Sequence, residues 1–283
     1  MNLLLIHTGG TIGMVPGPNG LMPQDGLVEA AVAARLPDHV TLHQHLFTPL
    51  IDSASVGPDH WNEILDVIDA HPNCPVLLIH GTDTLSFSGA ALSQALEGLG
   101  RRVVLCASMM PLGAGGDAEG NLEFALKALI DGTQKGVFLS FAGKLLPASG
   151  LVKHHCSDPD AFRAIPQDVL LPPKCRRFSP KKLAIVTLAA GLPAAALRAL
   201  LAELDGAVLR VFGAGTIMSD VGIIAALSDA IQRGVAIRAV SQCEVGHVAP
   251  GAYAAGAPLW DCGVQSGGRE TPEAALIHLW LNG

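Results

Sequence analysis

Two stretches of the sequence place threonine hydroxyls and glycines directly after apolar runs that have the length of buried strands. The first reads TGGT at 8–11 and follows the apolar run 3–6, and the second reads GTDT at 81–84 and follows the run 76–80. Glycine lets the backbone turn sharply and approach a ligand closely. Because ligands of open α/β sheets bind at the carboxyl ends of the strands, the two stretches predict one shared site.

The chemistry that these residues could perform is nucleophilic attack by a hydroxyl group. Thr11 is the candidate nucleophile, and a threonine needs a nearby group that takes its proton. Thr82, Asp83 and Lys153 offer such a group, because a desolvated lysine can accept a proton from a hydroxyl. Asp83 could orient that lysine or hold a cationic part of a substrate. His7 precedes the first stretch directly, and His80 precedes the second; histidines in such places are most often hydrogen-bonded core residues.

Other interpretations of these patterns remain open at this stage. The hydroxyls and Asp83 could cap the helices that come next in the chain, although their occurrence at two similar strand ends favours a site. Glycines at such a turn can also bind phosphate, but neither GxxxxGK[ST] nor GxGxxG is present. A zinc site can be written from four residues, without CxxC or HExxH spacing: His154, His155, Cys156 and Cys175. We predict no metal site.

Length and composition favour a cytoplasmic protein with a substantial hydrophobic core. The chain has 283 residues, 49% of them hydrophobic and 15% charged, which predicts one large domain and one smaller domain. No apolar run reaches the length of a membrane span, and a strand that begins at Asn2 leaves no room for a signal peptide. The net charge of −7 argues against nucleic acid as a partner. Six scattered cysteines are typical of free thiols in a cytoplasmic protein.

Strand and helix patterns alternate along the chain, which predicts a mostly parallel sheet covered by helices on both faces. Prolines and glycines at 14–26 predict an irregular loop, which we interpret as a lid over the site. We predict a large N-terminal α/β domain at 1–165, a proline-rich linker at 166–182 and a smaller C-terminal α/β domain at 183–283. The expected strands are 3–6, 76–80, 102–107, 137–142, 183–188, 207–212 and 236–241, and the expected helices begin near 27, 59, 85, 121, 194, 221 and 272.

Several motifs together resemble the L-asparaginase family, in its shorter cytoplasmic form that is often called type I. The motifs are HTGGTIGM (7–14), IDSAS (51–55), HGTDTLSFSGAAL (80–92), SMMP (108–111) with Asp117, Lys153, FGAGTI (212–217) and SQC (241–243). The resemblance covers nearly the whole chain. It implies an asparaginase-like fold of a large and a small α/β domain, assembled as a homodimer or homotetramer. It also implies hydrolysis of L-asparagine to L-aspartate and ammonia without a metal or an organic cofactor.

The resemblance also implies a role for each matched residue. Thr11 matches the usual nucleophile, and Thr82, Asp83 and Lys153 match the second catalytic group, in which the aspartate also binds the amino group of the substrate. The remaining matches are substrate-binding residues. Asp52 and Ser53 match residues that hold the α-groups of the substrate, and Ser108 falls where a backbone carbonyl approaches the substrate amide.

One departure from the family pattern lies in the expected lid. The family usually carries a tyrosine there, whose phenol assists the first threonine, whereas this chain reads Gly20-Leu21-Met22-Pro23. Leucine cannot transfer a proton, and the loss of such help typically slows catalysis by on the order of 10²- to 10⁴-fold. The sequence therefore favours an asparaginase that Leu21 makes slow, and it leaves two alternatives. One is a catalytically weak or inactive protein that binds or senses an amino acid, and the other is the amidase subunit of a tRNA-dependent amidotransferase, for which the chain is short.

Overall fold

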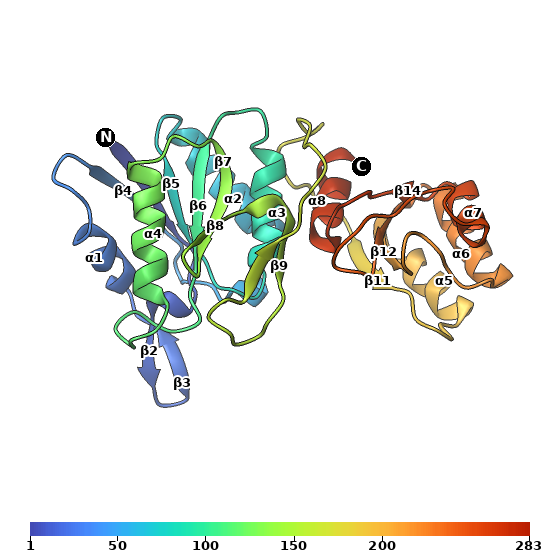
Figure 1. The fold of residues 1–283 in the computed structure, drawn as a ribbon, viewed down its shortest axis with the longest axis horizontal. Helices are drawn as coiled ribbons and strands as arrows, with labels where there is room; N and C mark the ends of the chain where they lie inside the picture. The colour runs from blue at the N-terminus through green and yellow to red at the C-terminus, as the bar shows by residue number, and fades with distance from the viewer. The chain divides into compact units, whose positions relative to one another are not determined.

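Six strands form the main sheet of the first of two compact units, which comprise residues 1–164 and 165–283 of the computed structural model (Figure 1). The structure describes all residues from 1 to 283. Neighbouring strands are parallel except for the last pair, which is antiparallel. In sheet order the strands are β4 (Thr41–Leu46), β1 (Asn2–His7), β5 (Val76–Ile79), β6 (Arg102–Cys106), β7 (Gly136–Phe141) and β8 (Lys144–Pro147).

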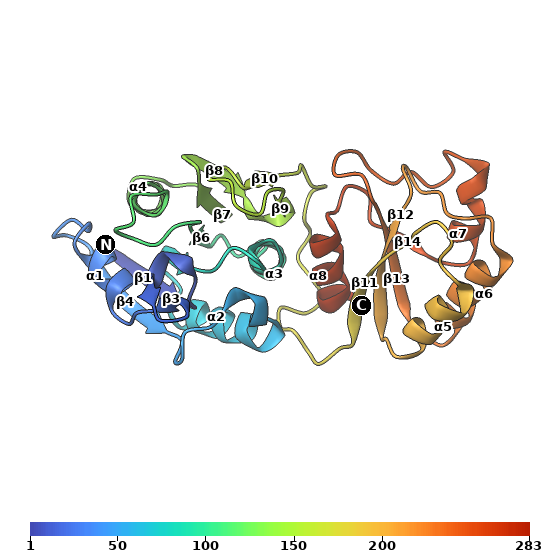
Figure 2. The ribbon, with the colours of Figure 1, turned by 90° about the horizontal axis from the view of Figure 1, so that it is seen from below.

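Helices cover both faces of this sheet (Figure 2). On one face, α1 (Leu27–Ala33) and α4 (Ala118–Ile130) pack on the apolar side chains of β1, β5 and β6. On the other face lie α2 (Pro58–Ala70) and α3 (Leu85–Ala95), which contact each other. β5 is buried along its whole length, as expected for a parallel strand between two helical layers. The predicted fold class is confirmed for this unit.

The predicted irregular loop at 14–26 is wrong, because most of it forms a β-hairpin. β2 (Met14–Gly17) pairs with β3 (Gly20–Pro23) in antiparallel register, and the chain turns at 18–19. A two-stranded ribbon has no third strand that needs the missing proline N–H groups, so prolines are tolerated there. The hairpin projects from the end of the sheet (Figure 1), and its base is closed by a hydrogen bond of 2.9 Å from Gln24 N to the carbonyl of Gly13.

Four further strands in the first unit escaped the sequence prediction. β4 is an edge strand of mixed polarity, TLHQHL, and therefore lacks the apolar run that marked its neighbours. The segment 144–158, for which no strand was predicted, contains β8, a 3-10 turn (Ala148–Gly150) and β9 (Leu151–Lys153). β9 pairs in antiparallel register with β10 (Phe162–Ala164). β8, β9 and β10 are three or four residues long, too short for a clear period.

The second unit is a smaller α/β layer structure around one parallel sheet. Its strands follow the order β11 (Leu183–Thr187), β12 (Gly206–Val211), β13 (Ala236–Ser241) and β14 (Gln265–Ser266). Three helices pack on this sheet: α5 (Ala194–Ala202) and α6 (Val221–Gln232) on one face, and α8 (Pro272–Asn282) on the other (Figure 1). The short helix α7 (Ala257–Asp261) adds Leu259 to the core. Thr271 caps α8, which begins at the predicted position, by accepting a hydrogen bond of 3.2 Å from Ala274 N.

The segment predicted as a linker, 166–182, has no helix or strand but makes several contacts within the second unit. Lys181 Nζ donates to the carbonyls of Leu279, Trp280 and Gly283, where a cation is favourable because helix α8 ends there. Along the whole chain, no helix is long and apolar enough to cross a membrane.

Candidate active site

The two threonine-bearing strand ends lie against each other. β1 and β5 are adjacent parallel strands, so that residues 7–11, here called the β1 end, and residues 80–84, here called the β5 end, leave the sheet at the same edge. A Cβ atom built on Gly10 would lie 2.7 Å from the backbone nitrogen of Gly81, which shows how closely the two backbones approach. Gly10 also has a φ of +111°, a conformation that favours glycine. The glycines of both motifs therefore permit the contact between them.

Thr8 and Thr11 differ in accessibility although both belong to the β1 end. The Thr8 side chain is buried, and its hydroxyl donates a hydrogen bond of 3.0 Å to the carbonyl of Ile79. Thr11 begins a 3-10 turn (Thr11–Gly13) and is half-buried. A nucleophile must be reached by the substrate, so the exposure favours Thr11 over Thr8.

Lys153 joins the β5 end through contacts that span about 70 positions of the sequence. Its Nζ donates a hydrogen bond of 2.9 Å to Thr82 Oγ1 and forms an ion pair of 2.7 Å with Asp83 Oδ1. β9 carries this lysine to the site by packing against α3, the helix that begins directly after the GTDT motif. Thr82 is buried, whereas the Asp83 side chain is 62% exposed and can meet a ligand. The structure thus brings Thr82, Asp83 and Lys153 together.

The loop at 51–55 lies between the two strand ends. The backbone N–H of Ile51 donates a hydrogen bond of 2.7 Å to the carbonyl of Thr8. The buried Ser53 Oγ accepts a hydrogen bond of 3.2 Å from Asp83 N. Thr84 Oγ1 donates to the carbonyl of Ser53 at 2.5 Å. Asp52 is exposed, and one of its oxygens caps the short 3-10 turn at 53–55. Ser53 is therefore held in place by the β5 end, while Asp52 keeps one carboxylate oxygen for a ligand.

Ser108 lies in the loop after β6, and its side chain is used inside that loop. The buried hydroxyl donates a hydrogen bond of 2.5 Å to the carbonyl of Met110. Asp117 accepts hydrogen bonds from the N–H groups of Met109 and Met110, at 2.9 to 3.1 Å, and fixes the turn. Leu112 N donates a hydrogen bond of 3.1 Å to the carbonyl of Ile12, which connects this loop to the turn that begins at Thr11. Such an arrangement leaves the Ser108 backbone, rather than its hydroxyl, as the group that could contact a ligand.

Each strand end begins with a buried histidine that has a specific partner. His80 Nδ1 lies 2.7 Å from the carbonyl of Gly81, and its Nε2 lies 2.9 Å from Ser88 Oγ. Burial lowers the pKa of His80 from 6.5 to about 4, so the ring is neutral near pH 7. His7 Nδ1 lies 2.6 Å from Glu29 Oε1. Sequence reasoning anticipated hydrogen-bonded core histidines but missed Glu29, which is an ordinary residue type for the first turn of a helix.

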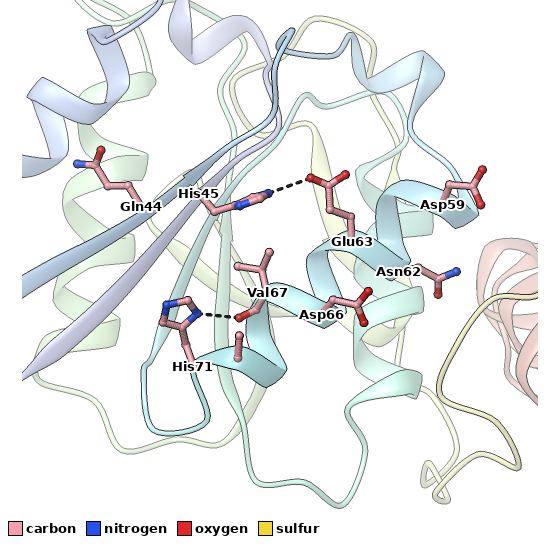
Figure 3. Close-up of a pocket in the computed structure, with 9 residues that line it drawn as sticks. Gln44, His45, Asp59, Asn62, Glu63, Asp66, Val67 and His71 are labelled. Atoms are coloured by element: carbon pink, nitrogen blue, oxygen red, sulfur yellow. Dashed lines mark hydrogen bonds and ion pairs between the residues drawn. The ribbon is translucent and has the colours of Figure 1, made fainter.

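Side chains outside these strand ends show no arrangement for a metal ion. No group of three or more histidine, cysteine, aspartate or glutamate side chains could hold one, which leaves the zinc alternative without a ligand set. A groove of about 510 Å³ lies between β4 and α2 (Figure 3), and polar side chains such as His45 and Glu63 line it. These two side chains are hydrogen-bonded to each other, with 2.9 Å between His45 Nε2 and Glu63 Oε1. None of the lining residues belongs to the two strand ends.

The fold and this edge of the sheet define a two-unit α/β protein in which two threonine-bearing strand ends meet at the carboxyl edge of a parallel sheet. Comparison with family models gives the family. Residues 2–174 match the model "Asparaginase, N-terminal", and residues 182–282 match the "Glutaminase/Asparaginase C-terminal domain". The chain belongs to the asparaginase family, as the motifs predicted.

Individual relatives and solved structures agree with this assignment. The chain is 30% identical to L-asparaginase 1 of Escherichia coli K12 over 308 aligned positions, which cover 98% of this chain and 90% of the relative. The structure of L-asparaginase I from Vibrio cholerae is similar with a TM-score of 0.86 and 29% identity, covering 99% of this chain and 92% of that one. The thermostable L-asparaginase from Thermococcus kodakarensis gives a TM-score of 0.85 at 25% identity, with the same coverage of both chains.

Proposed function

We propose that the protein is an amidohydrolase that converts L-asparagine and water to L-aspartate and ammonia, with Thr11 as nucleophile. Family membership supports the reaction class. The observation that carries the assignment of residues is the contact of Lys153 Nζ with Thr82 Oγ1 (2.9 Å) and Asp83 Oδ1 (2.7 Å), at a strand end that touches the β1 end. The proposal requires no metal and no organic cofactor.

In the proposed reaction, the Thr11 oxygen attacks the side-chain amide carbonyl, and its proton passes to a base. Backbone N–H groups of the strand ends stabilise the oxyanion that forms, and ammonia leaves after it receives a proton. Water then attacks the acyl-enzyme, releases L-aspartate and returns the proton to Thr11. Thr82 and Lys153, which are hydrogen-bonded to each other, act together in moving this proton, while Asp83 orients the lysine.

Substrate selection in this proposal depends on the polar groups at the same edge. The carboxylates of Asp52 and Asp83 bind the ammonium group of the amino acid, and Ser53 contacts its α-carboxylate. The backbone carbonyl of Ser108 accepts a hydrogen bond from the substrate amide. A zwitterionic amino acid has an ammonium group for the two carboxylates and a carboxylate for Ser53. An uncharged amide of similar size has neither.

Ammonia release from L-asparagine tests the proposal. Thr11→Ala and Lys153→Met should each abolish most of the activity, by about 10³-fold or more, because each removes a group that acts on the reacting atoms. Thr11→Ser keeps a hydroxyl and serves as the matched control, with part of the activity retained. Wild-type rates in both Thr11→Ala and Lys153→Met would exclude this site.

Substitution of the hairpin residue Leu21 tests whether the protein is a slow enzyme or a binding or sensing protein with the same fold. Leu21 lies on β3, is 49% exposed and cannot provide the phenol that the family pattern has there. Leu21→Tyr should therefore raise kcat, by about 10-fold or more, if the phenol is the missing group.

Calorimetry completes the test, since tight binding of aspartate or asparagine without turnover would favour the sensing function. An isolated chain that hydrolyses free asparagine would argue against the amidotransferase subunit.

We further propose a cytoplasmic homodimer or homotetramer. Exposed apolar side chains of the second unit, Val221, Val245 and Tyr253, support the association. The six free cysteines are in keeping with a reducing compartment. Light scattering coupled to gel filtration measures the mass, and a monomer of 29.2 kDa at micromolar concentration would contradict the assembly.

A further inference from the structure

His7 and Glu29 form a buried pair that connects the two flanks of the hairpin. The His7 side chain is fully buried at the end of β1, and Glu29, in the first turn of α1, is 8% exposed. His7 Nδ1 and Glu29 Oε1 are 2.6 Å apart although the residues are 22 positions apart in the sequence. The contact therefore closes a loop of chain that contains Thr11, both hairpin strands and the start of α1.

The imidazole ring of His7 also packs against the turn that leads into the hairpin. A Cβ built on Gly13 would lie 3.3 Å from both Cε1 and Nε2 of His7. Any residue other than glycine at this position would therefore require the ring to move slightly. Gly13 ends the 3-10 turn that begins at Thr11, and its carbonyl accepts the hydrogen bond from Gln24 N that closes the hairpin. One ring thus contacts the turn of the nucleophile and, through Glu29, the helix beyond the hairpin.

Stability alone gives no reason for this pair. His7 Nε2 and Glu29 Oε2 are both buried without a hydrogen-bond partner. A buried polar pair with such unsatisfied atoms is commonly no more stabilising than an apolar pair of similar volume. What the pair provides, and an apolar pair would not, is a directional hydrogen bond between two flanks of a projecting hairpin.

We propose that His7 and Glu29 are a positioning pair, which fixes the turn of Thr11 and the base of the hairpin relative to β1. The proposal rests on the proposed role of Thr11. Residues that hold the substrate, Asp52, Ser53 and Asp83, lie on other segments, so loss of the pair displaces the attacking group but not the binding groups. A displacement of about 1 Å can lower a rate by on the order of 10²-fold. The pair therefore acts on kcat more than on KM.

Four variants separate positioning from stability. Glu29→Gln keeps an acceptor for the His7 N–H, Glu29→Leu removes it, and the double variant His7→Phe/Glu29→Leu replaces both groups by apolar ones. Ile64→Val, in the buried face of α2, is the matched control for a general loss of core packing. For each variant we would measure kcat and KM for L-asparagine, the melting temperature, and amide hydrogen exchange of residues 11–24.

The expected pattern is a split between activity and melting temperature. Glu29→Gln should keep kcat within about 3-fold of wild type, whereas Glu29→Leu should lower it by about 10- to 100-fold with KM within about 3-fold. The double variant should regain melting temperature relative to Glu29→Leu, but not kcat or the slow exchange of residues 11–24. Ile64→Val should lower the melting temperature without changing exchange at 11–24.

Two results would overturn the proposal. One is a double variant whose kcat recovers together with its melting temperature, because the pair would then be only structural. The other is unchanged exchange at residues 11–24 in Glu29→Leu, since the base of the hairpin would then not depend on the pair. If wild type releases no ammonia from asparagine, the proposed function fails, while hydrogen exchange still tests the pair by itself.

Discussion

The β1 end and the β5 end each begin with a buried histidine and continue with glycine and threonine residues, but their histidines have different partners. Both ring nitrogens of His80 are bonded, one to the carbonyl of Gly81 and one to Ser88. Ser88 Oγ in turn accepts a hydrogen bond of 2.9 Å from Trp61 Nε1. His7 instead meets the carboxylate of Glu29, and its second nitrogen has no partner. At the β5 end, both ring nitrogens of the neutral histidine are hydrogen-bonded. At the β1 end, the histidine has one hydrogen bond, to the carboxylate of Glu29.

The difference between the histidines matches the type of segment that the chain enters after each strand end. After the β5 end the chain enters α3, whose residues are buried along nearly the whole helix. After the β1 end it enters the hairpin, where Leu21 and Met22 are 49% and 48% exposed. Segments with few buried contacts open at lower free energy than core helices do. One strand end is therefore fixed by its surroundings, and the position of the other depends on a specific pair of side chains.

The largest expected effect comes from forcing the two ends apart with Gly10→Ala. The new Cβ would meet the backbone of Gly81 at 2.7 Å, and alanine is strained at a φ of +111°. We expect a loss of more than about 4 kcal/mol in the free energy of unfolding. Gly20→Ala is the matched control, because its φ of +118° gives the same kind of strain while nothing lies within 4 Å of its Cβ. The strain alone should cost about 1 to 3 kcal/mol. Equal losses in urea unfolding would contradict a tight contact between the ends.

A smaller effect is expected from pH, because the neutral His80 belongs to the network of the β5 end. Its pKa is lowered from 6.5 to about 4 in the folded protein, so the unfolded chain binds more protons between these values. Stability should be complete above about pH 6.5 and should fall as the pH falls toward 4, by about 3 kcal/mol in total from this group. Unfolding free energies measured between pH 4 and pH 7 test this. His80→Gln should flatten that dependence, and an unchanged slope in the variant would assign the effect to other groups.

The sequence was sufficient to predict the strands that are buried on both faces and the meeting of two of their ends. β1 and β5 appear as continuous apolar runs, and the rule that parallel strands end at one edge places their motifs together. Edge and hairpin strands carry no such signal. β4 has polar residues because one of its sides lacks a partner strand, and the hairpin tolerates prolines for the same reason.

Contacts within the site were less predictable than the strands that carry it. The proximity of Lys153 to Thr82 depends on β9, a three-residue strand without a period, so the spacing of the two residues in the sequence could not show that the lysine reaches the threonine. Glu29 is adjacent to Val28, a core residue of α1, yet an acid in a first helical turn is usual at the protein surface. Its burial accompanies the contact with His7, which lies 22 positions earlier in the chain, before a segment whose prolines and glycines predicted an irregular loop.

The smallest effect is expected for Thr8→Val, which sharpens the comparison between the two threonines of the β1 end. Valine is close to threonine in shape and is also β-branched, so it fits the buried position. The variant loses the hydrogen bond from Thr8 Oγ1 to the carbonyl of Ile79. That carbonyl still accepts a hydrogen bond of 3.1 Å from the backbone N–H of residue 8. Because no partner is left unsatisfied, the free energy of unfolding should fall by only about 1 kcal/mol. Ammonia release should stay within about 2-fold of wild type, since a hydroxyl that is buried and donated to the sheet cannot meet a substrate. If Thr8→Val lost as much activity as Thr11→Ala, the nucleophile would have to be reassigned within the same motif.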